Sequence, residues 1–211
     1  MSTATLLRCT EFDGDKWPNY EYQPSFILGF HGCKRAVGQA IINGGDQHLL
    51  WSRKPFDWLG HGIYFWEGDP ARAWEWAIAK QKDGRIDDPF VIGAIIDLRY
   101  CLDLFGQEAL NQVKGAHVAF KRAARESGVA LPKNVGSTPD KAGRMLDCAV
   151  LNSLHAYRQK NGLKSYDSVR APFLEGTHLY RNAGFRSHNH IQIAVRNVEC
   201  IKGYFLPIRS T

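Results

Sequence analysis

The hydrophobic and polar positions of the first hundred residues predict alternating strands and helices. Residues 25–30 form a short apolar run that ends at a His-Gly pair, which is typical of a strand. From Cys33 to Ile41 apolar residues recur at steps of three and four, which predicts an amphipathic helix ending at Gly44-Gly45. This segment therefore reads as strand, turn and helix.

The same pattern repeats farther along the chain. Residues 62–66 predict a strand that leads into Asp69-Pro70, a good cap and first-turn pair for a helix to about Lys82. Residues 90–98 are rich in β-branched side chains and predict a buried strand.

The second half of the chain begins with helices and returns to strands. Apolar spacing from Leu110 to Ala124 predicts one helix, and residues 137–139 open a second that runs to about Lys160, roughly 33 Å long. Strands are expected at residues 168–174, 191–195 and 201–206. Residues 1–24 show neither period and are expected to be a loosely ordered arm before a single domain of residues 25–211. We therefore predict an α+β fold with a helical insertion at about 107–165.

Composition narrows the class of protein. With 211 residues, 44% hydrophobic and 23% charged, the chain suits one globular domain rather than a disordered or fibrous protein. No run approaches the roughly 20 apolar residues of a membrane span, and no signal segment is recognisable, so we expect a cytoplasmic protein without membrane contact. The five cysteines are scattered and contain no C-x-x-C pair, which favours buried thiols over disulfides or a metal cluster.

The charge is concentrated in the predicted insertion. Lys and Arg number 27 against 21 Asp and Glu, a net charge of +6, and ten basic against four acidic residues fall between Gln107 and Ser165. Such a block is either a solvated helix face or a footprint for a polyanion. If it binds nucleic acid, the candidate residues are Lys121, Arg122, Arg125, Lys141 and Arg144.

Two segments carry a resemblance to a known family. They are Gly29-Phe30-His31-Gly32-Cys33, and Gly60-His61-Gly62-Ile63-Tyr64-Phe65. A strand ending in His-Gly, then a helix, then a Gly-x-Gly-Ile-Tyr-Phe strand resembles the ADP-ribosyltransferase superfamily, in its poly(ADP-ribose)-polymerase-like branch. The resemblance covers about residues 26–98 and 167–207. It implies a split β-sheet core and NAD as co-substrate.

The resemblance also implies roles for particular residues. His31 is expected to bind a ribose hydroxyl, the backbone of Gly32 the nicotinamide amide, and Tyr64 the face of the nicotinamide ring. In NAD the nicotinamide ring is cationic, and a phenol face attracts a cation by about 0.5 to 2 kcal/mol. When nicotinamide leaves, the ribose carbon that held it becomes an oxocarbenium-like centre, as in glycoside hydrolysis. Taken singly, the histidine and tyrosine could equally be core residues.

The chain departs from the family at two positions. Gln192 stands where the family has a glutamate, and an amide can bind hydroxyl groups but cannot act as a base. Transfer of a single ADP-ribose is therefore expected rather than polymer synthesis. Glu75 occupies the place of the second stacking aromatic residue, so Trp74 or Trp76 must take that role.

Other candidates for chemistry are acids and histidines. Glu175, before the Gly176 turn, is the first candidate for the carboxylate that takes the acceptor's proton, and Glu67 is the second. Asp147 is more simply explained by pairing with a basic residue. His188 and His190 would share one face of a strand, but no third metal ligand is evident, so no metal is expected.

The acceptor of ADP-ribose is not named by the fold. The basic block favours RNA or DNA, with Trp51, Trp58 or Tyr180 available to stack a base. By analogy, compact bacterial transferases of this kind serve as toxins in toxin–antitoxin or phage-defence systems, which suggests a neutralising antitoxin partner. Three alternatives stay open: a transferase that modifies protein, an inactive NAD- or ADP-ribose-binding module, and simple NAD hydrolysis.

Overall fold

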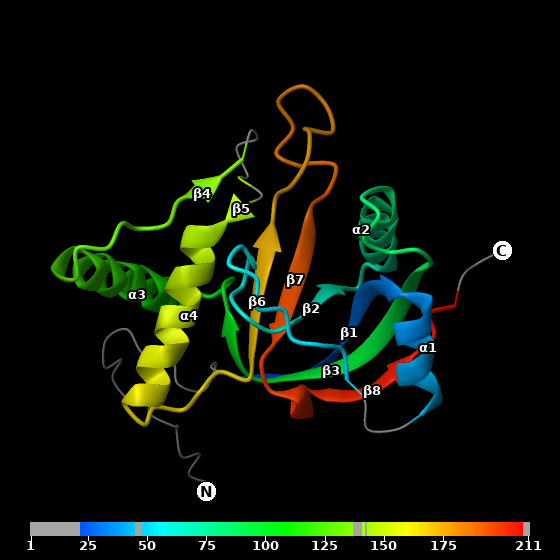
Figure 1. Cartoon of the computed structure of the whole chain (residues 1–211), viewed down its shortest axis with the longest axis horizontal. Coiled ribbons are helices and arrows are strands. Elements are labelled where there is room, and N and C mark those ends of the chain that lie inside the picture. The colour runs from blue at the N-terminus through cyan, green and yellow to red at the C-terminus, as the bar shows by residue number, and fades with distance from the viewer. Residues whose placement is uncertain (1–21, 45–47, 137–140, 142, 209–211) are drawn as a thin grey trace, which may run out of the picture.

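The structure is a computed structural model that describes residues 22–44, 48–136, 141 and 143–208. It is a mixed α+β fold, as the sequence predicts (Figure 1). Most of the predicted arm, residues 1–21, lies outside the described residues, as do Cys9 and the 137–139 segment. None of the described helices has the length and apolar character that a membrane crossing requires.

Six strands form one sheet in the order β1-β2-β7-β6-β3-β8. All of their pairings are antiparallel except that of β3 with β6. Since β1 also pairs with β3, five of the strands close into a ring, with β8 at the outer side of β3. The strands are β1 (Tyr22–Lys34), β2 (Ile63–Glu67), β3 (Pro89–Asp103), β6 (Ser168–Phe173), β7 (His190–Val195) and β8 (Ile201–Phe205).

Helices cover both faces of this sheet. On one face Ile63 and Phe65 of β2 are fully buried in a cluster that includes Ile41 of α1. On the other face Trp66 packs with Ala73 of α2, and α4 covers β6 and β7. The helices are α1 (Arg35–Asn43), α2 (Pro70–Lys82), α3 (Gln107–Glu126) and α4 (Met145–Lys160), with a short 3-10 helix at Val198–Cys200.

Several local predictions are confirmed. Helix α2 spans Pro70–Lys82, and the Asp69 side chain accepts a hydrogen bond from the amide of Arg72 at 2.9 Å. A carboxylate there satisfies an amide that the first helical turn leaves without a partner. Four of the five cysteines, Cys33, Cys101, Cys148 and Cys200, are buried and free.

Several predicted boundaries are wrong. Strand β1 begins at Tyr22, inside the predicted arm of residues 1–24, and β3 continues to Asp103 instead of ending at Leu98. Strand β1 continues through Cys33 to Lys34, where pairing with β3 holds it extended, so α1 begins only at Arg35. The second helix of the insertion begins at Met145 rather than near residue 138, which makes it about 24 Å long. A two-stranded ladder of β4 (Asn134–Val135) and β5 (Gly143–Arg144) precedes it, and the Asn134 side chain accepts from the first amides of α4.

Candidate functional site

The sheet divides at His31. Strands β1 and β2 pair only at Gly29 with Glu67 and at Phe30 with Trp66. Beyond that point β1 follows β3 to its end, whereas β2 follows β7. His31 is the first residue past the last β1–β2 pair. The division of the sheet therefore places an imidazole at the point where the two strands separate.

His31 bridges this gap. Its Nδ1 lies 2.7 Å from the carbonyl oxygen of Tyr64, so Nδ1 carries the proton and donates it. Burial lowers the pKa of His31, which keeps the ring neutral. In that tautomer Nε2 is an acceptor, and no described residue donates to it. The ring is thus prepared to accept a hydrogen bond from a hydroxyl group.

Tyr64 is held by its hydroxyl group. The oxygen donates to the carbonyl of Gly60 at 2.6 Å and accepts from the amide of Leu59 at 2.7 Å. Burial is the largest cause of the raised pKa of Tyr64, so the phenol stays protonated. With both hydrogen bonds made inside the chain, this side chain is suited to contact through its ring rather than to proton transfer.

The glycines of the motif have structural reasons of their own. Gly60 has a φ of +75°, a backbone conformation that side chains rarely adopt. A Cβ on Gly62 would lie 2.9 Å from the carbonyl oxygen of Val195, and one on Gly32 would lie 2.4 Å from that of Ala73. Helix α2 therefore already occupies the space beside Gly32 that the resemblance associates with a ligand.

Of the two tryptophans that could replace the second stacking aromatic, Trp76 is the one beside the histidine. Its ring centroid lies 6.3 Å from that of His31 and 6.0 Å from that of Trp66. Trp74 packs against the same buried cluster as Trp76 and also lines a cavity between α1 and α2.

Gln192 lies on the strand next to β2. On β7 it is paired with Trp66 on one side and with Ala171 of β6 on the other. It is partly exposed, and its amide makes no hydrogen bond to any described residue. His31, Tyr64 and Gln192 thus stand on three neighbouring strands, β1, β2 and β7.

The candidate carboxylates are all paired. Glu175 accepts from Arg72 Nη2 at 2.8 Å and lies 3.7 Å from Nδ1 of His190. Glu67 binds Arg170 through both oxygens, at 2.6 and 2.8 Å. The prediction that Asp147 is paired is confirmed, since it accepts from Asn134 at 2.8 Å and from Arg144 at 3.4 Å.

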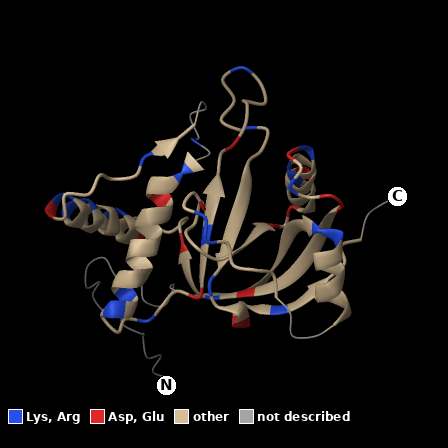
Figure 2. Ribbon diagram, in the orientation of Figure 1, with Lys and Arg blue, Asp and Glu red and all other residues tan. Residues whose placement is uncertain are grey.

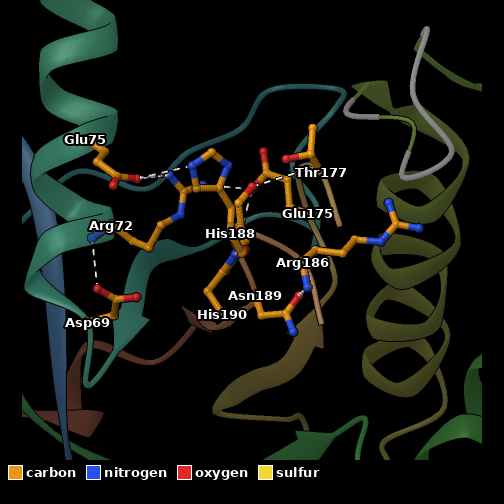
Figure 3. Close-up of polar contacts among 10 residues, drawn as sticks. Asp69, Arg72, Glu75, Glu175, Thr177, Arg186, His188, Asn189 and His190 are labelled. Atoms are coloured by element: carbon orange, nitrogen blue, oxygen red, sulfur yellow. Dashed lines mark hydrogen bonds and ion pairs between the residues drawn. The ribbon is translucent and has the colours of Figure 1, made fainter. Parts of the chain in front are cut away.

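Arg72 was not singled out from the sequence, yet it connects two parts of the site (Figure 3). From α2 its guanidinium binds Glu75 at 2.9 Å and Glu175, in the loop between β6 and β7, at 2.8 Å. The sequence places Arg72 in the first helical turn after Asp69-Pro70, which was the one signal that could have found it. Its partner Glu175, however, is 103 residues away. Only the folded chain reveals that link.

His190 and His188 do not share a strand face, because β7 begins at His190. The His190 side chain is 0% exposed, its Nδ1 donates to the carbonyl of His188 at 2.7 Å, and its Nε2 has no hydrogen-bond partner in the part of the chain that the structure describes. Burial lowers its pKa, so the ring is neutral. Within the described residues no group of three or more His, Cys, Asp or Glu could hold a metal ion.

The basic block divides into exposed residues and one enclosed residue. The ribbon in Figure 2 is coloured for Lys and Arg toward the outer end of α3 and at both ends of α4. Lys121, Arg122, Arg125 and Lys141 are exposed. Arg144 is different: its side chain is only 20% exposed, and its guanidinium lies over the ring of Trp58 at 4.5 Å.

Comparisons with known proteins add no assignment to this geometry. A scan against models of protein families, a search of curated proteins and a search of solved structures each found no match.

Proposed function

We propose that the chain is a NAD-dependent mono-ADP-ribosyltransferase of the poly(ADP-ribose)-polymerase-like branch, acting on RNA or DNA as an effector of the bacterial toxin or phage-defence kind. One observation carries this proposal. The sheet divides at His31, whose imidazole bridges to Tyr64, and an unengaged amide at Gln192 stands on the adjacent strand.

These residues fit the ribose and nicotinamide end of NAD. Nε2 of His31 accepts from a ribose hydroxyl, and the Gln192 amide offers both a donor and an acceptor. The Tyr64 ring, with its hydroxyl engaged elsewhere, presents only a face. Bound NAD supplies the glycosidic bond whose cleavage releases neutral nicotinamide and exposes the ribose carbon to the acceptor.

A base for the acceptor's proton is offered by Glu175. It follows β6 and approaches His190, two residues from Gln192 on β7. Its ion pair with Arg72 holds the carboxylate in place. With glutamine at 192, no second carboxylate promotes chain elongation, so one ADP-ribose is transferred per acceptor site.

The acceptor assignment depends on the exposed basic side chains of α3. Lys121, Arg122 and Arg125 lie on one helix and present positive charge to solvent, which suits a phosphate backbone. Changing all three to Glu is expected to weaken nucleic-acid modification, and wild-type modification is expected to decline steeply as salt rises.

The first experiment follows the label from NAD. Purified chain is incubated with NAD labelled in its adenylate half and with a cell lysate, and aliquots are treated with nuclease or protease. We expect nuclease alone to destroy the labelled product. Label that survives nuclease but not protease identifies a protein acceptor, and free ADP-ribose formed at a rate indifferent to nucleic acid identifies NAD hydrolysis.

Variants then test the residues. His31→Ala, Tyr64→Ala and Gln192→Ala are expected to reduce NAD consumption strongly, with folding checked by circular dichroism. His48→Ala and Tyr157→Ala are matched controls, because both side chains are exposed and lie outside the proposed site. Wild-type turnover in the first three variants would refute the site, and NAD bound intact over hours would indicate a binding module.

A further inference from the structure

An open cavity lies beside the proposed NAD site. It has a volume of about 770 Å³ and is lined by residues of α3, α4, strand β6 and the loop that carries Trp58. Ligand pockets in proteins usually measure about 300 to 1,000 Å³. The space between the insertion and the sheet is therefore large enough for a ligand of nucleotide size.

The walls of this cavity are mainly apolar and aromatic. Leu110 and Val113 come from α3, Val150 from α4, and Phe173 from β6. The rings of Trp58 and Phe173 lie 4.7 Å apart at their centroids. A flat aromatic base finds here the kind of surface on which bases stack.

Arg144 adds a planar cation to this wall. Its guanidinium lies 4.5 Å from the Trp58 ring and 5.1 Å from the Phe173 ring. Its Nε is buried and has no hydrogen-bond partner among the described residues. A planar guanidinium both stacks on bases and binds phosphate through paired hydrogen bonds.

The rim of the cavity is positive. Lys114 and His117 from α3 and Arg186 from the β6–β7 loop line it. Figure 3 shows the Arg186 side chain extending toward α4. The one acid in the lining, Asp147, is already bound by Asn134 and Arg144. The net charge therefore favours an anion.

The cavity is also placed next to the proposed chemistry. Its lining residue Ala171 is the strand partner of Gln192, so the two Cα positions are about 4.5 to 5.5 Å apart. Leu59, which also lines the cavity, donates its amide to the Tyr64 hydroxyl. The cavity and the division of the sheet thus share a wall.

From these contacts we infer that the cavity holds one unpaired nucleotide of the acceptor strand, with its base against Trp58 and Phe173 and its phosphate at the Lys114 and Arg186 rim. Its role in presenting the acceptor rests on the proposed function. The binding itself does not, because it follows from shape, aromatic surface and charge.

The test measures binding in the absence of NAD. A fluorescein-labelled single-stranded RNA of twelve nucleotides, and the same sequence as DNA, are titrated with the chain and followed by fluorescence anisotropy. Val113→Trp fills the cavity and is expected to lower affinity roughly tenfold or more, the order of effect of losing one stacked base. Its melting temperature is measured alongside to show that it folds.

Lys114→Glu tests the rim without risk to the fold, because Lys114 is exposed. We expect weaker binding and a decrease of about 1 in the slope of log affinity against log salt. Lys82→Glu makes the same change in net charge at the end of α2, away from the cavity, and is expected to bind as the wild type does. Arg144→Lys keeps the charge but loses the planar group, and is expected to bind more weakly.

The outcomes separate this inference from the proposed function. Folded Val113→Trp and Lys114→Glu that bind both strands with wild-type affinity would overturn it. So would a raised KM for NAD in Val113→Trp with unchanged strand affinity, since the cavity would then belong to the adenylate half of NAD. If the variants lose strand binding while the wild type never transfers ADP-ribose, the cavity assignment holds and the proposed function fails.

Discussion

The buried histidine of α4 makes the stability of the chain depend on pH. His155 is 6% exposed, its ring packs edge-on against Tyr166 at 6.2 Å, and no described residue forms a hydrogen bond with either of its nitrogens. Burial, followed by repulsion from Arg196 and Arg158, lowers its pKa to about 3. The folded chain therefore holds this ring neutral throughout the neutral and mildly acidic range.

The size and sign of the effect follow from linkage between protonation and folding. In the unfolded chain the pKa of His155 is about 6.5. As the pH falls below that value, the unfolded state binds a proton at this ring and the folded state does not. The contribution of this histidine to stability is full above pH 6.5 and is lost progressively between about 6.5 and 3. Between pH 7.5 and 5 the loss is about 2 kcal/mol, at 1.4 kcal/mol per pH unit.

The assay is urea unfolding at pH 7.5 and at pH 5, followed by circular dichroism. His155→Leu removes the titrating group, so its free energy of unfolding is expected to fall about 2 kcal/mol less than that of the wild type between the two pH values. His48→Leu, at an exposed position, is the matched control. Equal pH dependence in the wild type and His155→Leu would refute the reasoning.

Three further substitutions test particular contacts. Tyr64→Phe deletes a hydroxyl that makes two backbone hydrogen bonds, and is expected to cost about 1 to 3 kcal/mol in unfolding free energy. Gly32→Ala places a methyl group 2.4 Å from the backbone of α2 and is expected to cost about 1 to 3 kcal/mol, seen as a lower melting temperature; an unchanged value would contradict the packing role given to this glycine. Arg170→Met leaves the carboxylate of Glu67, which is 18% exposed, without its ion-pair partner. We expect urea unfolding to show a loss of roughly 3 kcal/mol in unfolding free energy, more than for Arg181→Met at an exposed loop position.

Short-range signals in the sequence predicted most of the elements. Asp69-Pro70 marked the start of α2 correctly, because a cap acts on amides only two or three residues away. The cue at residues 137–139 was of the same kind but misleading. The side chain that binds first-turn amides of α4 belongs to Asn134, which lies more than ten residues before those amides and reaches them because β4 pairs with β5.

The arrangement of the site depends on contacts that no local pattern contains. The motif around His31 and Tyr64 could be found in the sequence, but their hydrogen bond depends on where β1 leaves β2. The excess of basic residues in the insertion could also be read from the sequence. A count of charges, however, does not distinguish Arg144 from Lys121. Burial against Trp58 distinguishes the two, and burial depends on how the insertion folds back onto β6.

Within the proposed function, the charges around the division of the sheet favour transfer of a single group. Residue 192 is a glutamine rather than the glutamate of the family that the chain resembles, and the proposed base, Glu175, is bound by Arg72. A polymerase needs a carboxylate that can draw a proton from a ribose hydroxyl of the growing chain, which is a weakly acidic group. An acceptor that attacks readily, or that is held close to the exposed ribose carbon, requires less help from a base. If the cavity beside Gln192 holds the acceptor as we infer, positioning takes over part of the work that a glutamate at 192 would do in the proposed reaction.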